Sequence, residues 1–153
     1  MSVLADRILQ EIEQAAALYH RLVLVVAATG SGKTSALSEV HQQTAAPLIN
    51  VNLELSRLML ELTERQRSLQ VPRLLSDIVT ASKAEVVLLD NIEMLFDIGL
   101  KQDPLRLLQG LSRNMTVVAS WNGTVDGKNL IYAKADHPEY RRYPIADFLV
   151  VSP

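Results

Sequence analysis

The chain has 153 residues, of which 48% are hydrophobic, and this length and composition suit one domain with a substantial buried core. It contains no cysteine, which excludes disulfide bonds, thiolate catalysis and a cysteine-ligated zinc site. The formal net charge of −2 indicates no nucleic-acid-binding surface, so we expect any link to DNA to be indirect.

The N-terminal residues predict a helix of about 19 residues with Ser2 as its N-cap. Its apolar positions follow one stripe that would pack on a sheet: Val3, Leu4, Ile8, Ile12, Ala15 and Tyr19. Core packing is the expected role of Tyr19, and a place for Tyr19 or His20 near a nucleotide base is the alternative. The start is acidic, without a basic signal sequence, and no apolar run could cross a membrane, so we expect a cytoplasmic protein without a membrane partner.

A phosphate-binding loop follows. Five consecutive apolar residues, Leu22 to Val26, predict a strand buried on both faces of a parallel sheet. The next eight residues, Ala27-Ala-Thr-Gly-Ser-Gly-Lys-Thr34, form a Walker A pattern in which Ala27 replaces the first glycine, and a helix is expected to begin near Gly32. Glycines let backbone N–H groups surround phosphate oxygens, and the positive end of the helix dipole adds to the same site.

Each side chain of this loop has an expected role. Lys33 supplies positive charge to the β- and γ-phosphates, and the Thr34 hydroxyl is placed to bind Mg²⁺. We therefore expect ATP or ADP, with Mg²⁺, to be bound by the residues of this loop, which are Thr29, Gly30, Ser31, Gly32, Lys33, Thr34 and Ser35.

The middle of the chain predicts a second strand over Leu48–Val51 and a helix over Glu54–Leu69. Pro72 suits the first turn of a further helix that runs to about Ser82. The stretch Glu85-Val-Val-Leu-Leu-Asp90 is then a Walker B pattern, an apolar strand that ends in a carboxylate at the edge where active sites of parallel sheets collect. We expect Asp90 to hold Mg²⁺ together with Thr34.

The C-terminal third predicts a helix from Pro104 to about Ser112 with Asp103 as its N-cap, and a buried strand over Met115–Ser120 that leads into Trp121-Asn122-Gly123. Further strands are expected over Asn129–Ala133 and Phe148–Val151, with a polar loop over Asp136–Pro144 between them. We expect a single nucleotide-binding domain over 1–153, divided into an N-terminal helix (1–20), a core (21–123), and C-terminal strands and a loop (124–153).

This order of elements, with one strand between the two Walker motifs, resembles the additional-strand branch of P-loop NTPases, which includes AAA+ and RecA-like ATPases. The resemblance implies a three-layer α/β fold around a central parallel sheet with strand order 5-1-4-3-2. It also implies that Asn122 stands where AAA+ proteins carry the sensor residue that reads the γ-phosphate. With its compact loop and Leu88-Leu-Asp90-Asn-Ile-Glu93, the whole chain resembles the BrxF family of bacterial BREX phage-defence systems, which implies a role in a larger defence complex.

Two departures from this family pattern matter. Asn91 stands where these ATPases usually place a catalytic glutamate, and asparagine can orient water but cannot act as a base. We therefore expect Glu93, in preference to Glu54, to be the catalytic carboxylate. The chain also ends before the helical lid of AAA+ proteins, so an activating arginine is expected in trans, within a homo-oligomer or a larger complex, from one of three residues: Arg113, Arg141 or Arg142.

Besides a slow Mg²⁺-dependent ATPase, three other functions are alternatives. A GTPase would need an asparagine where Ala133-Lys-Ala-Asp136 has Ala133, and a small-molecule kinase would need an arginine-rich lid that nothing in the chain resembles. The main alternative is a nucleotide-binding interaction module with little or no hydrolysis, which Asn91 and the missing lid favour.

Overall fold

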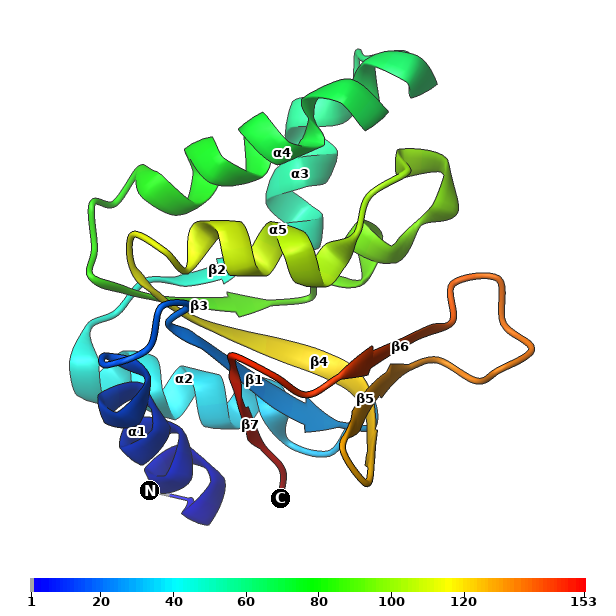
Figure 1. The fold of residues 1–153 in the computed structure, drawn as a ribbon. Helices are drawn as coiled ribbons and strands as arrows, with labels where there is room; N and C mark the ends of the chain where they lie inside the picture. Colours follow the sequence, from blue (N-terminus) through cyan, green and yellow to red (C-terminus); the bar gives the residue numbers. More distant parts are fainter. Residues whose placement is uncertain (1) are drawn as a thin grey trace.

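A computed structural model describes residues 2–153 as a sheet between two layers of helices (Figure 1). The predicted domain and its N-terminal helix range include Met1, which lies outside the described residues. The helices are α1 (Val3–Ala15), α2 (Lys33–Thr44), α3 (Val51–Met59), α4 (Glu64–Thr80) and α5 (Pro104–Leu111), with short 3₁₀ helices η1 (Glu93–Phe96) and η2 (Ile98–Leu100). The strands are β1 (Leu22–Ala27), β2 (Leu48–Asn50), β3 (Val86–Asp90), β4 (Thr116–Asp126), β5 (Asn129–Tyr132), β6 (Arg141–Pro144) and β7 (Leu149–Val151).

The parallel part of the sheet has the order β2-β3-β4-β1-β7. With β7 as the fifth core strand, this is the expected order 5-1-4-3-2, so the predicted three-layer α/β fold of P-loop NTPases is confirmed. In the register of the sheet, Ala27 is opposite Asn122 and Asn50 is opposite Asp90. The carboxyl ends of four strands therefore meet at one edge, which is where ligands bind in open parallel sheets.

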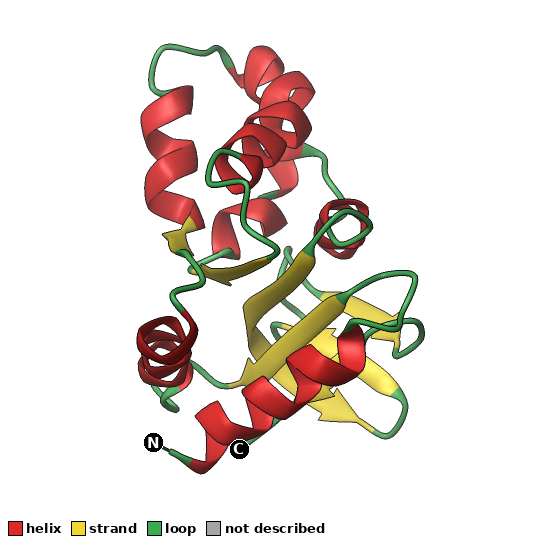
Figure 2. Cartoon of the chain, turned by 90° about the vertical axis from the view of Figure 1, so that its left-hand side faces the viewer, coloured by secondary structure: helices red, strands yellow, loops and turns green. Residues whose placement is uncertain are grey.

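Alternating side chains of β1 explain why helices cover both faces of the sheet (Figure 2). Val23 and Val25 pack with α1 and α2 on one face, while Leu22, Leu24 and Val26 pack with α3, α4 and α5 on the other. All five side chains are buried, as expected for a strand covered on both sides. This packing fixes β1, and with it the start of the loop that follows.

The helix predicted over Glu54–Leu69 is wrong, because the chain forms two helices there. α3 ends at Met59, and Thr63 begins α4 with a capping box in which the Thr63 side chain accepts from the backbone N–H of Gln66 and the Gln66 side chain accepts from that of Thr63. Pro72, expected to start a helix, lies inside α4. Proline offers no N–H to the carbonyl of Ser68 four residues earlier, and the Gln102 side-chain amide donates to that carbonyl instead, at 2.7 Å.

The N-terminal helix is shorter than predicted. Ser2 is its N-cap, as expected, but α1 ends at Ala15. Tyr19 therefore lies in the connection to β1 with 71% of its surface exposed, so its expected core packing is wrong. Within the described part of the chain, no helix has both the length and the apolar character needed to span a membrane.

The region after Asn122 also differs from the prediction. β4 does not end near Ser120 but continues to Asp126, and it pairs there with β5 in an antiparallel hairpin that β6 extends. β6 lies within the segment predicted to be a polar loop. A Cβ atom at Gly123 would lie 1.9 Å from the carbonyl oxygen of Ile131, so only glycine lets β5 approach β4 this closely.

Candidate nucleotide-binding site

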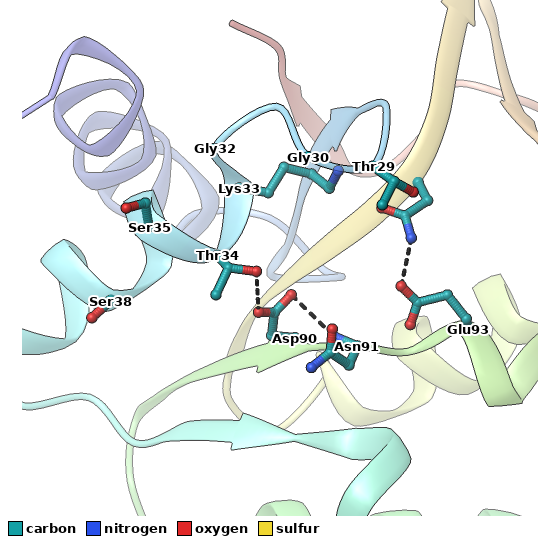
Figure 3. A pocket seen from close by; sticks show the side chains of 11 residues that line it. Thr29, Gly30, Gly32, Lys33, Thr34, Ser35, Ser38, Asp90, Asn91 and Glu93 are labelled. Carbon is teal, nitrogen blue, oxygen red and sulfur yellow. Dashed lines mark hydrogen bonds between the residues drawn. The ribbon is translucent and has the colours of Figure 1, made fainter.

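A pocket of about 550 Å³ lies at the carboxyl edge of the parallel strands (Figure 3). It brings together residues from the loop after β1, the first turns of α2, the end of β3 with the turn that follows, the start of η1, and β4. These residues are Thr29, Gly30, Gly32, Lys33, Thr34, Ser35, Ser38, Asp90, Asn91, Glu93 and Asn122. Ser31 is the one predicted loop residue outside this lining, and its hydroxyl donates to the carbonyl of Ala28.

The backbone of the loop relies on its two glycines. Gly30 and Gly32 have φ values of 81° and 91°, a left-handed conformation that glycine adopts without strain. Gly32 is the N-cap of α2 and has no side chain to accept from the first-turn N–H groups, which therefore remain available to an anion. Ala27 is not among the residues with positive φ, so alanine fits the position of the usual first glycine.

Lys33 is the buried cation of the pocket, with 6% of its surface exposed. Its Nζ donates to the carbonyl oxygens of Ala27, at 2.9 Å, and Ala28, at 2.7 Å. Burial lowers the pKa of Lys33, and the nearby carboxylates of Asp90 and Glu93 oppose that effect only in part. Neither of the two ion pairs found within residues 2–153 includes Lys33. No carboxylate therefore contacts the Lys33 ammonium group directly. A phosphate oxygen would supply that missing counter-charge.

Asp90 is held in one orientation by three donors. The Thr34 hydroxyl donates to Oδ2 at 2.7 Å, while the Ser120 hydroxyl and the Asn91 backbone N–H donate to Oδ1 at 2.7 and 3.0 Å. Thr34 and Asp90 are thus adjacent oxygen donors of the kind that Mg²⁺ takes, alongside water and phosphate. No cluster of three His, Cys, Asp or Glu side chains able to hold a metal occurs in residues 2–153, so a metal here would depend on phosphate oxygens for further ligands.

Ser120 was missed by the sequence analysis. It is buried in an apolar strand, and it lies two residues before Asn122, so both side chains project from the same face of β4. A hydroxyl at this spacing from a strand-end polar residue is the signal that could have identified it.

Glu93 lines the pocket and is held by two side-chain amides. Asn122 Nδ2 donates to one carboxylate oxygen, and Asn52 Nδ2 donates to the other at 3.1 Å. Asn52 is itself fixed, because its Oδ1 accepts from the backbone N–H of Met94 at 2.9 Å. Asn52 was also missed, since its contact with Glu93 depends on how α3 packs beside η1. Glu54 does not line the pocket but pairs with Arg57 at 3.5 Å on the surface of α3.

The backbone conformation at position 91 explains why asparagine stands there. Its φ is 52°, in the left-handed region that asparagine tolerates better than glutamate does. Its carbonyl accepts from the backbone N–H of Asn52 at 2.8 Å, which ties the end of β3 to the start of α3. The turn at Asn91 carries the chain into η1, whose first residue is Glu93, and so brings that carboxylate to the pocket.

None of the three arginines considered as activators lines the pocket. Arg113 precedes β4 and therefore lies at the opposite edge of the sheet from Asn122, roughly 20 Å away at the usual rise per strand residue. Arg141 donates to the Gln102 backbone carbonyl at 2.9 Å, and Arg142 pairs with Asp126 at 3.8 Å.

Tyr19 and His20 are equally distant from the site. Both residues precede β1, whose far end carries the phosphate loop, and the Tyr19 ring contacts the Arg113 guanidinium at 5.6 Å. The alternative that placed one of them at a nucleotide base is therefore wrong for a single chain.

No protein-family model and no curated protein matches the chain. Among solved structures, that of C. elegans PCH-2 matches with a TM-score of 0.40 and 18% sequence identity, over 97% of this chain and 39% of that chain. The chain therefore spans well under half of this structural neighbour, and a likeness of this strength says nothing about activity. What the strand order and the helices on both faces of the sheet do establish is that the chain has the α/β fold of P-loop NTPases.

Proposed function

We propose that the chain binds ATP with Mg²⁺ and hydrolyses it slowly. The observation that carries this proposal is one pocket in which a buried, unneutralised Lys33 adjoins both the uncapped start of α2 and the hydrogen-bonded pair of Thr34 and Asp90. Few ligands other than a polyphosphate with a divalent cation would satisfy all three groups at once.

The roles of these residues follow from their chemistry. Lys33 and the first-turn N–H groups of α2 would bind the β- and γ-phosphates, and Thr34 and Asp90 would hold Mg²⁺, which neutralises charge on the phosphates when bound. Ser120 would keep Asp90 oriented toward Thr34 by its bond to the other carboxylate oxygen.

Glu93 is the proposed base that accepts a proton from the attacking water. Its two amide partners, on α3 and β4, restrict the carboxylate to one orientation. Turnover is expected to be slow, because no arginine lines the pocket in the described residues, and an arginine that stabilises phosphoryl transfer is worth about 10³-fold or more.

Replacement of Lys33 tests nucleotide binding. Lys33→Ala removes the buried cation and is expected to abolish measurable ATP affinity in isothermal titration calorimetry, while the melting temperature stays close to that of the wild type. Lys128→Ala, at the exposed turn between β4 and β5, is the matched control and should bind ATP normally. A folded Lys33→Ala protein with unchanged ATP affinity would refute the proposal.

A nucleotide-binding module without hydrolysis is the second candidate. The observation that favours it is that both Glu93 carboxylate oxygens already accept from amides, which competes with activation of water. Asp90→Ala separates the two candidates, because it should lower the Mg²⁺-dependent ATPase rate of an enzyme but leave the background phosphate release of a module unchanged.

We further propose that the chain works in a homo-oligomer or in a bacterial phage-defence complex of the BREX type, which the sequence resemblance supports. In an oligomer, Arg113 of a neighbouring copy is the first candidate to complete the site, so the ATPase rate per chain should rise with protein concentration in the wild type but not in Arg113→Ala.

For the defence role, an intact defence locus that carries Lys33→Ala should lose its protection of cells against phage plating. A concentration-independent rate and full protection would contradict these two proposals respectively.

A further inference from the structure

The pocket lining has no ring and no large apolar side chain within the described part of the protein. We propose that the site recognises the triphosphate and its Mg²⁺ and does not read the base, so that ATP, GTP, CTP and UTP bind with similar affinity. This inference rests on the proposed function, because it concerns which nucleoside triphosphates the same site accepts.

The charged and strongly hydrogen-bonding side chains of the pocket already have proposed roles at the phosphate end of the ligand. Under the proposed function Lys33 would contact phosphate, Thr34 and Asp90 would hold the metal, and Asn122 already donates a hydrogen bond to Glu93. None of these five groups remains to contact a base, which in a nucleotide lies beyond the sugar and away from the γ-phosphate.

The remaining side chains of the lining are poorly suited to base recognition. Thr29 and Ser35 are exposed, and Ser38 and Asn91 are only partly buried. A hydrogen-bonding group discriminates strongly between ligands only when the wrong ligand leaves it buried and unpaired. A side chain that water can reach loses little binding free energy when a base offers the wrong donor or acceptor, because water takes the place of the base.

The aromatic residues that could stack on a base are occupied elsewhere. The rings of Phe96 and Tyr132 stack at a centroid distance of 3.5 Å, and the fully buried Trp121 meets both of them edge to face. Tyr143 packs against Trp121 from the hairpin side. These rings fill the interior between η1 and the β4–β5 hairpin and present no open face to the pocket.

The histidines are no closer to the pocket. His20 precedes β1 at the far edge of the sheet, and His41 lies in the last turn of α2, at the end of that helix away from the loop. His137 is exposed in the segment between β5 and β6, where its ring nitrogen accepts from the Glu139 backbone N–H. No histidine and no aromatic residue is therefore among the side chains that line the pocket.

The ratio of the dissociation constants of different nucleotides tests this proposal. A site built to hydrogen-bond one ligand group rejects an analogue that lacks the group by about 10⁴-fold or more. For a site that contacts only the triphosphate and metal, we expect the dissociation constants of ATP, GTP, CTP and UTP to agree within about tenfold.

The experiment is calorimetric titration of the whole chain, in the presence of Mg²⁺, with each of the four nucleotides and with inorganic tripolyphosphate. Agreement of the four constants within about tenfold, with tripolyphosphate competing against ATP, is the expected result. Lys33→Ala should abolish measurable binding of all four nucleotides, since it removes a phosphate contact, and Lys128→Ala should weaken none.

Two results would overturn the inference and leave the proposed function intact. One is a preference of more than about tenfold for one nucleotide, and the other is binding of all four nucleotides without competition from tripolyphosphate, because either would mean that base or sugar is read. If no triphosphate binds at all, the proposed function and this inference fail together.

Discussion

Replacement of Gly123 by alanine should damage both the fold and the site. The added Cβ would lie 1.9 Å from the Ile131 carbonyl oxygen, a backbone atom that cannot rotate away, so β4 and β5 must separate by about 1.5 Å to reach the 3.4 Å at which ordinary contact begins. We expect that movement to break the hydrogen bond from the Trp121 indole to the same carbonyl, at 3.1 Å, and to leave a buried donor unpaired. An unpaired buried group costs about 1–3 kcal/mol, and lost strand pairing brings the expected loss in the free energy of unfolding to about 3 kcal/mol.

Urea denaturation followed by circular dichroism measures this loss, which corresponds to a fall in melting temperature of about 6–12 °C for a chain of this size. Gly110→Ala is the matched control. Gly110 lies in α5, a Cβ there would meet nothing within 4 Å, and alanine is expected to stabilise the helix by about 0.5–1 kcal/mol. A loss below about 1 kcal/mol for Gly123→Ala would refute the reasoning, since it would mean that the hairpin moves at little cost.

Three further predictions concern single side chains. Glu93→Gln should lower kcat by about 10²–10⁴-fold in steady-state assays without changing ATP affinity. Glu54→Gln, on the surface of α3, is the control and should leave both quantities unchanged. Equal rates for the two variants would show that Glu93 is not the base. Ser120→Ala should raise the Mg²⁺ concentration needed for half-maximal activity by about tenfold, because Asp90 loses an orienting donor. Ser120→Thr keeps a hydroxyl and should return that concentration to the wild-type value. An unchanged Mg²⁺ titration of Ser120→Ala would contradict this role. Burial, aided by two nearby glutamates, raises the pKa of Tyr132 to about 12, so the folded state keeps a proton that the unfolded state releases above pH 10, and stability falls as the pH rises through that window. Between pH 8 and pH 11 the wild type should lose about 1 kcal/mol more than Tyr132→Phe in urea denaturation, and equal losses would show that burial of this phenol is not the cause.

The phosphate loop and the strand that ends in Asp90 were predictable because their signals are local, whereas the expected strand order came from the family resemblance. An apolar strand, two glycines and Lys33-Thr34 follow one another without a gap, and Asp90 ends a second apolar strand. In the structure Gly30 and Gly32 occupy left-handed conformations, and α2 begins at Lys33, next to the expected start near Gly32. Which of these residues bind nucleotide or metal stays a prediction.

The parts that the sequence could not predict depend on contacts between distant segments. Asn52 meets Glu93, and Ser120 meets Asp90, only because the sheet brings α3, β3 and β4 together. Pro72 is another case, since the usual rule that proline starts or breaks a helix fails once a side chain from outside α4 bonds the carbonyl that proline leaves unpaired.

Strand β4 belongs to two sheets, and the change from one to the other falls beside the pocket. Asn122 is paired with Ala27 in the parallel sheet, and the next residue, Gly123, is paired with Tyr132 in the hairpin. An extended strand has no slack to absorb movement, unlike the loop that usually follows a sheet edge. The loop between β5 and β6 projects from the body of the molecule (Figure 1), and we expect a force applied there to reach the Asn122 amide and its hydrogen bond to Glu93 through β5 and β4. Because such coupling is reciprocal, a ligand that changes the Asn122–Glu93 contact must also change how tightly the hairpin is held, and hydrogen exchange of the β5 and β6 amides would report the state of the pocket.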